Sequence, residues 1–239
     1  MRLNKRATDA LREVSVETKV NKHAEGSCLI KFGDTHILCT ATIEETLPPF
    51  LKGKHLGGWV TAEYSLLPRS TESRVRREIS QGKPSGRTQE IQRLISRSLR
   101  SVVNLKALGE RQVIIDCDVL QADGGTRTAS ITGGYIALHL ALQTLVEKKI
   151  YQRVPLTSDI AAVSCGIIGK EILLDLDYKE DSNADVDANF VINSKNNLVE
   201  IQATAEKNSF SEEQFLSILN IARIGTKHLF EIQNKALGK

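Results

Sequence analysis

The sequence is poor in the residues that support several common classes of site. Only 5% of its 239 residues are aromatic, and it has one tryptophan and four cysteines. No two cysteines form a Cys-x-x-Cys motif and no histidine stands at zinc-finger spacing, which argues against structural zinc. Each cysteine lies in an apolar run, so we expect buried free thiols in a reducing compartment rather than disulfides.

Other absences restrict location and fold. No stretch approaches the length of apolar residues needed to cross a bilayer, so no membrane partner is expected. The basic N-terminus lacks the apolar core and cleavage site of a secretory signal, and Asp9 and Glu13 argue against an organelle presequence. These features predict a cytoplasmic protein. The absence of G-x-G-x-x-G and of G-x-x-x-x-G-K-[ST] disfavours a Rossmann fold and a P-loop NTPase.

Strand and helix patterns are present in two successive sets. Period-2 alternation rich in Val, Ile and Thr predicts strands over 13–20, 27–33, 35–44, 60–67 and 111–123, then 160–169, 171–178, 188–194 and 198–205. Helical spacing of apolar residues predicts a helix from about Arg87, a second over 126–147 and a third from Ser211, where Gln214 completes a capping box.

These patterns predict the fold class. Strands followed by helices in each half indicate an α+β fold, a mixed α/β sandwich with antiparallel sheets covered by helices. Residues 151–155 read as a linker, so we expect one domain over 1–150 and a second over 151–239.

Charge is unevenly distributed, although the formal net charge is only +3. Residues 69–87 form a glycine- and proline-containing stretch that is strongly basic, and residues 171–187 are strongly acidic. Such a chain can hold a polyanion at one pole and a cation at the other. The basic stretch also fits a solvated charged loop, and few aromatic residues lie near it for base stacking.

The stretch DGGTRTASITGG, residues 123–134, follows an apolar strand and opens a helix. Glycines let a backbone approach an anion closely, and free amides at a helix start attract negative charge. Thr126 adds a hydroxyl and Arg127 a guanidinium, so the pattern fits phosphate binding by Gly124, Gly125, Thr126 and Arg127. A threonine-capped tight turn with a surface arginine fits it equally well. Arg87, at the start of another helix, could reach the same anion.

The segment DLDYKEDSNADVDANF suggests a cation site. Asp185 and Asp187 would point to one face of a strand, and Asp181 could fold back toward them across a turn. Converging carboxylates bind Mg²⁺ through oxygen and water ligands. One of the aspartates could instead be a general acid, and a solvated acidic loop remains an alternative.

Five long motifs resemble the ribonuclease PH family in the same order along nearly the whole chain. They are GSCLIKFGDTHILCTATIEE, GWVTAEYSLLPRSTESRVRRE, RTQEIQRLISRSLR, RQVIIDCDVLQADGGTRTASITGG and LLDLDYKEDSNADVDANFVI. The resemblance implies a ribonuclease PH-type fold and a phosphate-dependent 3′-to-5′ exoribonuclease that trims tRNA precursors. The products would be nucleoside 5′-diphosphates, and the reaction would run backward as 3′ nucleotide addition.

The resemblance also implies roles for individual residues. Inorganic phosphate would be the attacking co-substrate and Mg²⁺ the metal, in a homo-hexamer built as a trimer of dimers. The implied phosphate-binding residues are Arg87, Gly125, Thr126 and Arg127. The implied catalytic and metal-binding residues are Asp181 and Asp187. The implied RNA-binding residues, here named the loop arginines, are Arg69, Arg74 and Arg77.

Two other functions stay open. The chain could be a catalytically inactive, RNA-binding ring subunit of exosome type, although the joint presence of the implied phosphate and metal residues argues against that. It could also be a hydrolytic nuclease that uses the aspartates with two metal ions.

Overall fold

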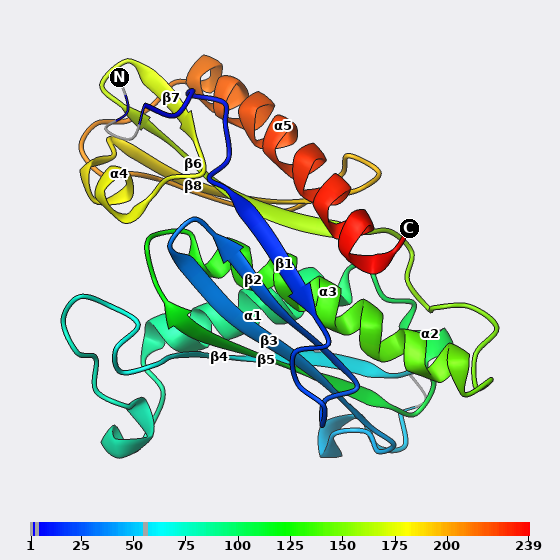
Figure 1. Ribbon diagram of the computed structural model, residues 1–239. Helices are drawn as coiled ribbons and strands as arrows, with labels where there is room; N and C mark the ends of the chain where they lie inside the picture. Colours follow the sequence, from blue (N-terminus) through cyan, green and yellow to red (C-terminus); the bar gives the residue numbers. More distant parts are fainter. Residues whose placement is uncertain (1, 3–4, 55–56) are drawn as a thin grey trace.

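Figure 1 shows the computed structural model of the chain, which describes residues 2, 5–54 and 57–239. The expected α+β sandwich is confirmed, with two sheets and the long helix α3 (Thr126–Glu147) between them. Helix α3 packs on β2 and β3 of one sheet and on β6 of the other.

The first sheet has five strands in the order β1-β2-β3-β5-β4. Their bounds are β1 (Val14–Thr18), β2 (Gly26–Phe32), β3 (Thr35–Glu44), β4 (Trp59–Leu66) and β5 (Gln112–Gln121). Burial alternates with period two along β3 and β5, as the sequence pattern predicts. Neighbours are antiparallel except β4 and β5, which are parallel because the chain crosses between them through helices.

Those crossover helices are α1 (Gly86–Arg100) and the short α2 (Leu105–Leu108). The apolar stripe of α1 is buried against β4 and α3, which confirms the helix expected from about Arg87. Two 3-10 turns, η1 (Pro49–Leu51) and η2 (Glu78–Gln81), lie in the connections on either side of β4.

The second sheet is antiparallel, with the order β7-β6-β8-β9. Its strands are β6 (Ile160–Ile168), β7 (Glu171–Leu174), β8 (Val186–Asn193) and β9 (Leu198–Ala205). Helix α5 (Glu212–Leu237) packs on β6, β7 and β8, and the predicted capping box of Ser211 and Gln214 is formed. The proposed domain boundary at 150 and 151 stays a prediction.

Helix α3 is buried on most of its surface and needs small residues to pack. A Cβ added at Gly133 would lie 2.7 Å from Ile30 Cγ2 and 2.9 Å from Cys39 Sγ. By length and composition α3 could cross a membrane, contrary to the expectation from the sequence, but most of it is buried inside the protein. All four cysteines are buried free thiols, as predicted.

One predicted strand is wrong in its second half. The strand expected over 171–178 ends at Leu174, and helix α4 (Tyr178–Asn183) begins four residues later. The cause is a capping box, in which the Asp177 side chain accepts from the Glu180 amide while the Glu180 carboxylate accepts from the Asp177 amide. Asp181 therefore lies on helix α4 rather than in a segment that leads into a turn.

Candidate active site

A glycine-rich corner joins β5 to α3. Gly124 and Gly125 have φ angles of +76° and +65°, in the left-handed region that costs glycine least. Gly125 is the N-cap of α3, so the first amides of this long helix stay without intrahelical partners. We name Asp123, Gly124 and Gly125 together the glycine corner.

The glycine corner borders a pocket of about 310 Å³. The pocket brings together the residues that the family resemblance implied for phosphate and metal: Arg87, Gly125, Thr126, Arg127, Asp181 and Asp187. These residues come from α1, α3, α4 and β8, which are far apart in the sequence. A larger cavity of about 650 Å³ beside His139 contains none of them, so its size does not mark the site.

Two arginines face two carboxylates across this pocket. The Arg127 guanidinium donates from Nη1 to Gln202 Oε1 at 2.8 Å and lies 3.6 Å from Glu90 Oε1. Arg87 is exposed in the first turn of α1. The charges of both arginines lower the pKa of Asp181 and of Asp187 and partly oppose the effects that raise them.

The Asp187 carboxyl group is the most perturbed of the acids. Burial, and then the like charge of Asp181, raise its pKa to about 6. Its Oδ1 is buried and has no hydrogen-bond partner among the described residues. Asp181 as a whole residue is exposed, but its carboxylate faces the pocket, where loss of water raises its pKa.

The two aspartates fit a divalent cation. A buried carboxylate oxygen without a partner next to a second carboxylate is an arrangement that a cation would stabilise. Mg²⁺ commonly uses one or two carboxylates and completes its coordination with water and substrate phosphates. The described residues hold no group of three His, Cys, Asp or Glu side chains suited to a metal, so Asp181 and Asp187 would need those further oxygen ligands.

Asp185 does not join this pair. Its side chain accepts from the Gly169 amide and from Lys207 Nζ at 2.8 Å, and it does not line the pocket. Asp185 lies just before the first residue of β8, and its carboxylate contacts Gly169 and Lys207. The prediction that Asp185 and Asp187 point to the same cation site is therefore wrong.

The loop arginines are exposed and do not line this pocket. Arg69 donates to the Glu72 carbonyl within the loop at 3.1 Å. Arg77 borders an adjacent pocket of about 280 Å³ that shares Tyr64 and Leu66 with the first. The loop arginines therefore lie outside the pocket, and RNA binding by this loop stays a prediction.

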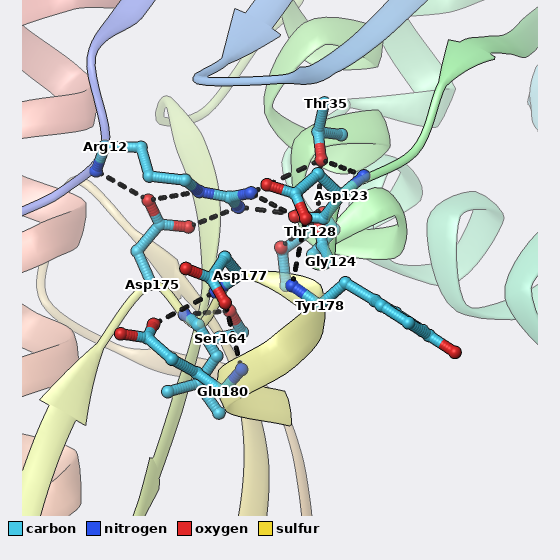
Figure 2. Close-up of polar contacts among 12 residues, drawn as sticks. Arg12, Thr35, Asp123, Gly124, Thr128, Ser164, Asp175, Asp177, Tyr178 and Glu180 are labelled. Atoms are coloured by element: carbon cyan, nitrogen blue, oxygen red, sulfur yellow. Dashed lines mark hydrogen bonds and ion pairs between the residues drawn. The ribbon is translucent and has the colours of Figure 1, made fainter. Parts of the chain in front are cut away.

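Several residues of the pocket wall were not predicted from the sequence. The Tyr64 hydroxyl and Thr126 Oγ1 lie 2.8 Å apart, and Ser164 and Asn189 also line the pocket. The Tyr178 side chain projects from the start of α4 and is 64% exposed at the rim (Figure 2). No spacing links these side chains to the glycine-rich segment, because they reach it only through folding.

Comparison with known proteins gives consistent matches. Residues 10–142 match domain 1 of the 3′ exoribonuclease family, and residues 160–225 match its domain 2. Similar solved structures include Rrp46 from rice (Oryza sativa), which is 18% identical with a TM-score of 0.80 over 99% of this chain and 100% of that chain.

Two archaeal structures are also similar. The Archaeoglobus fulgidus exosome with RNA bound to the active site is 22% identical, with a TM-score of 0.81 over 96% of this chain and 91% of that chain. An archaeal exosome core is 22% identical, with a TM-score of 0.75 over 98% and 90%. At such identities these likenesses show a common ribonuclease PH-type fold.

Proposed function

The chain belongs to the 3′ exoribonuclease family, and from that premise we propose that it is a phosphate-dependent 3′-to-5′ exoribonuclease. The observation that carries the proposal is the pocket in which two arginines and a helix start face two carboxylates. An oxyanion fits the first group of residues, and a metal-bound RNA phosphate fits the second.

Inorganic phosphate is the nucleophile in this proposal. Arg87 and Arg127 neutralise its charge from two sides, while Thr126 and the amides at the start of α3 donate hydrogen bonds. The Tyr64 hydroxyl, 2.8 Å from Thr126 Oγ1, restricts the rotation of the threonine hydroxyl. A phosphate oxygen attacks the terminal phosphodiester of RNA, the bond to the preceding 3′ oxygen breaks, and a nucleoside 5′-diphosphate leaves.

Asp181 and Asp187 hold the RNA end in place. Together they would bind Mg²⁺, which when present neutralises phosphodiester charge and stabilises the departing 3′ oxygen. With a pKa of about 6, Asp187 is mainly ionised at neutral pH and is available as a ligand. No side chain has to act as a nucleophile, so positioning and charge neutralisation supply the acceleration.

The RNA substrate and the assembly are less specific parts of the proposal. The sequence motifs suggested tRNA precursors and a homo-hexamer. The similar solved structures are exosome proteins and support an exosome-type role better than tRNA trimming. We therefore propose a single-stranded RNA 3′ end as the substrate class and a ring of family members as the assembly.

The test is the dependence of RNA shortening on phosphate. A 3′-tailed RNA is incubated with the protein and Mg²⁺ in a non-nucleophilic buffer, with and without phosphate, and the released nucleotides are separated. We expect nucleoside diphosphates to be released, and only in the reactions that contain phosphate. Monophosphates released without phosphate would indicate a hydrolytic nuclease and overturn the proposal.

An arginine variant sharpens this test. Arg127→Ala removes one of the two charges opposite the proposed phosphate site and is expected to raise the phosphate concentration needed for half-maximal activity. Its affinity for RNA should stay close to that of the wild type. A uniform loss of RNA affinity at every phosphate concentration would contradict the assignment of Arg127 to phosphate.

The second candidate is an inactive RNA-binding ring subunit of exosome type. The similarity to rice Rrp46 and to archaeal exosome proteins favours it, whereas the complete set of pocket residues favours catalysis. RNA binding without release of any nucleotide, in the presence of phosphate and Mg²⁺, would identify this second function.

A further inference from the structure

The described residues before β1, 2 and 5–13, lie along the second half of the protein, where the Leu174 amide of β7 donates to the Thr8 carbonyl at 2.8 Å (Figure 1). Three arginines of this segment contact Asp175, which precedes α4, and Glu180, which lies within α4. Arg2 makes a two-point contact with Glu180, at 2.7 and 2.6 Å. Arg6 contacts Asp175 Oδ2 at 3.3 Å and Glu180 Oε2 at 3.1 Å. Arg12 also pairs with Asp175, so the segment is tied to the helix that carries the site aspartate.

Arg12 differs from the other two arginines in what it reaches. On one side its Nε and Nη2 donate to the two Asp175 carboxylate oxygens at 3.0 and 2.7 Å. On the other side Nη1 donates to the Asp123 carbonyl, and Nη2 lies 3.4 Å from the Gly124 carbonyl (Figure 2). The guanidinium therefore connects the second half of the protein to the back of the glycine corner.

This connection is rigid and charged. Burial alone would lower the pKa of Arg12, but the charge of Asp175 raises it, so the guanidinium stays protonated. Asp175 is 1% exposed and has a φ of +53°, an uncommon backbone conformation for a residue with a side chain. The Asp175 carboxylate also accepts from the Arg12 backbone amide at 2.8 Å, which holds both residues in one orientation.

Thr35, the first residue of β3, also holds the glycine corner. Its hydroxyl donates to the Gly124 carbonyl at 2.7 Å and accepts from the Asp123 amide at 2.9 Å. On the opposite side, a Cβ added at Gly124 would lie 2.7 Å from the Leu176 carbonyl oxygen. The glycine corner is thus held between Arg12 and Thr35 behind it and the start of α4 beside it.

The orientation of the carbonyls determines where the amides point. In a planar trans peptide the C=O and the following N–H point in opposite directions. Carbonyls of Asp123 and Gly124 that point to Arg12 therefore direct the amides of Gly124 and Gly125 away from it. In the described part of the chain neither amide donates to a protein acceptor, and both glycines line the pocket.

We propose that Arg12 is a positioning residue, whose guanidinium, locked by Asp175, orients the two glycine peptides so that their amides face the oxyanion. The inference rests on the proposed function, because it deepens the phosphate site of that reaction. Asp175 serves this arrangement by fixing the guanidinium, and neither side chain lines the pocket.

The principal variant is Arg12→Lys. Lysine keeps a positive charge beside Asp175 but has no planar fork, so it cannot also hold the corner carbonyls. Losing these charge-assisted hydrogen bonds is expected to raise the KM for phosphate about tenfold. The kcat at saturating phosphate and the Kd for RNA should stay within about twofold, because the residues that face the RNA are unchanged.

Arg6→Lys is the matched control. Arg6 contacts the same Asp175 and Glu180, yet among the described contacts it does not reach the glycine corner. It should leave the KM for phosphate unchanged. Thr35→Val is a second test variant, which removes the hydroxyl behind the corner but keeps the Arg12–Asp175 pair, and it should raise the KM for phosphate in the same direction.

Hydrogen–deuterium exchange of peptides covering residues 122–128 supplies a readout that needs no activity. Faster exchange there in Arg12→Lys and Thr35→Val, but not in Arg6→Lys, supports positioning of the corner. Folded Arg12→Lys and Thr35→Val proteins with unchanged exchange and unchanged KM for phosphate would overturn it. If the wild type shows no phosphate-dependent cleavage, the proposed function fails, and the exchange data still decide the positioning role.

Discussion

Replacing Asp187 by asparagine should stabilise the protein while abolishing the proposed activity. In the folded chain the pKa of Asp187 rises from its ordinary value of 3.8 to about 6, because burial and then Asp181 disfavour the charge. The folded state therefore binds a proton more readily than the unfolded state between about pH 4 and pH 6. Stability falls as the pH rises through this window, and the loss is complete above the folded pKa.

The size of the effect follows from the shift. One pKa unit corresponds to about 1.4 kcal/mol, so a rise of about two units gives an upper value of about 3 kcal/mol. Asp187 is only partly buried, and solvent screens part of this penalty, so we expect Asp187→Asn to raise the free energy of unfolding by about 1–2 kcal/mol at pH 7.5.

Urea denaturation in EDTA, without phosphate, measures this difference at pH 7.5 and pH 4.5. The difference in the free energy of unfolding between Asp187→Asn and the wild type should be smaller at pH 4.5, where Asp187 in the folded wild type is protonated. Asp185→Asn is the control with the opposite sign, because the Lys207 contact and the Gly169 amide lower the pKa of Asp185. That lowered pKa contributes stability above the unfolded pKa, which the control variant loses.

Mg²⁺ provides a further test of the same reasoning. The cation should stabilise the wild type at pH 7.5 more than Asp187→Asn, and so reduce the gap between them. A gap that is equal at both pH values, or a variant no more stable than the wild type at pH 7.5 in EDTA, would refute the electrostatic account of this carboxylate.

Three other predictions concern the glycine corner, Tyr178 and the loop arginines. Gly124→Ala should lower the free energy of unfolding by at least about 1–2 kcal/mol because of its left-handed φ, and by more because the added Cβ would contact the start of α4. Gly169→Ala, at φ +61° with open space around it, should lower the free energy of unfolding only by the backbone strain, and urea denaturation of both variants measures the difference. Tyr178→Ala should raise the KM for RNA at least about fivefold if the exposed ring stacks on a base, and Tyr178→Phe should not. Neutralising all three loop arginines should reduce the slope of log affinity against log salt by about two for single-stranded RNA, and an unchanged slope in a filter-binding assay would remove the loop from the RNA path.

Much of the fold follows from local patterns. The alternation of apolar and polar residues in β3 and β5 corresponds to alternating burial in the structure, because one face of the first sheet packs on helices. The capping box at Ser211 places the start of α5 for the same local reason. The strand predicted through 178 ends at Leu174, because the capping box at Asp177 starts a short helix where the sequence pattern continued the strand.

The chemistry of the site was readable in part from residue types. Glycines before a helix with a threonine and an arginine fit an anion site, and clustered aspartates fit a cation site. A capped turn and a solvated acidic loop fit the same residues, so residue types alone left both alternatives open. Residue types and spacing could not tell Asp185 from Asp187 as a site residue, since Asp185 directly precedes β8 and Asp187 is its second residue, and only the family resemblance singled out Asp187. Only the tertiary packing around β8 pairs Asp185 with Lys207 and places Asp187 in the wall of the pocket.

The sequence by itself determined most of the elements and the basic and acidic segments, because these depend on residues close together in the chain, and it suggested residues for phosphate and metal. Tertiary structure alone decided that helices from both halves meet at one pocket and that Tyr64 contacts Thr126. It also decided that Arg12, more than a hundred residues from the glycine corner, holds its carbonyls. Such contacts depend on the path of the whole chain, and no local spacing encodes them.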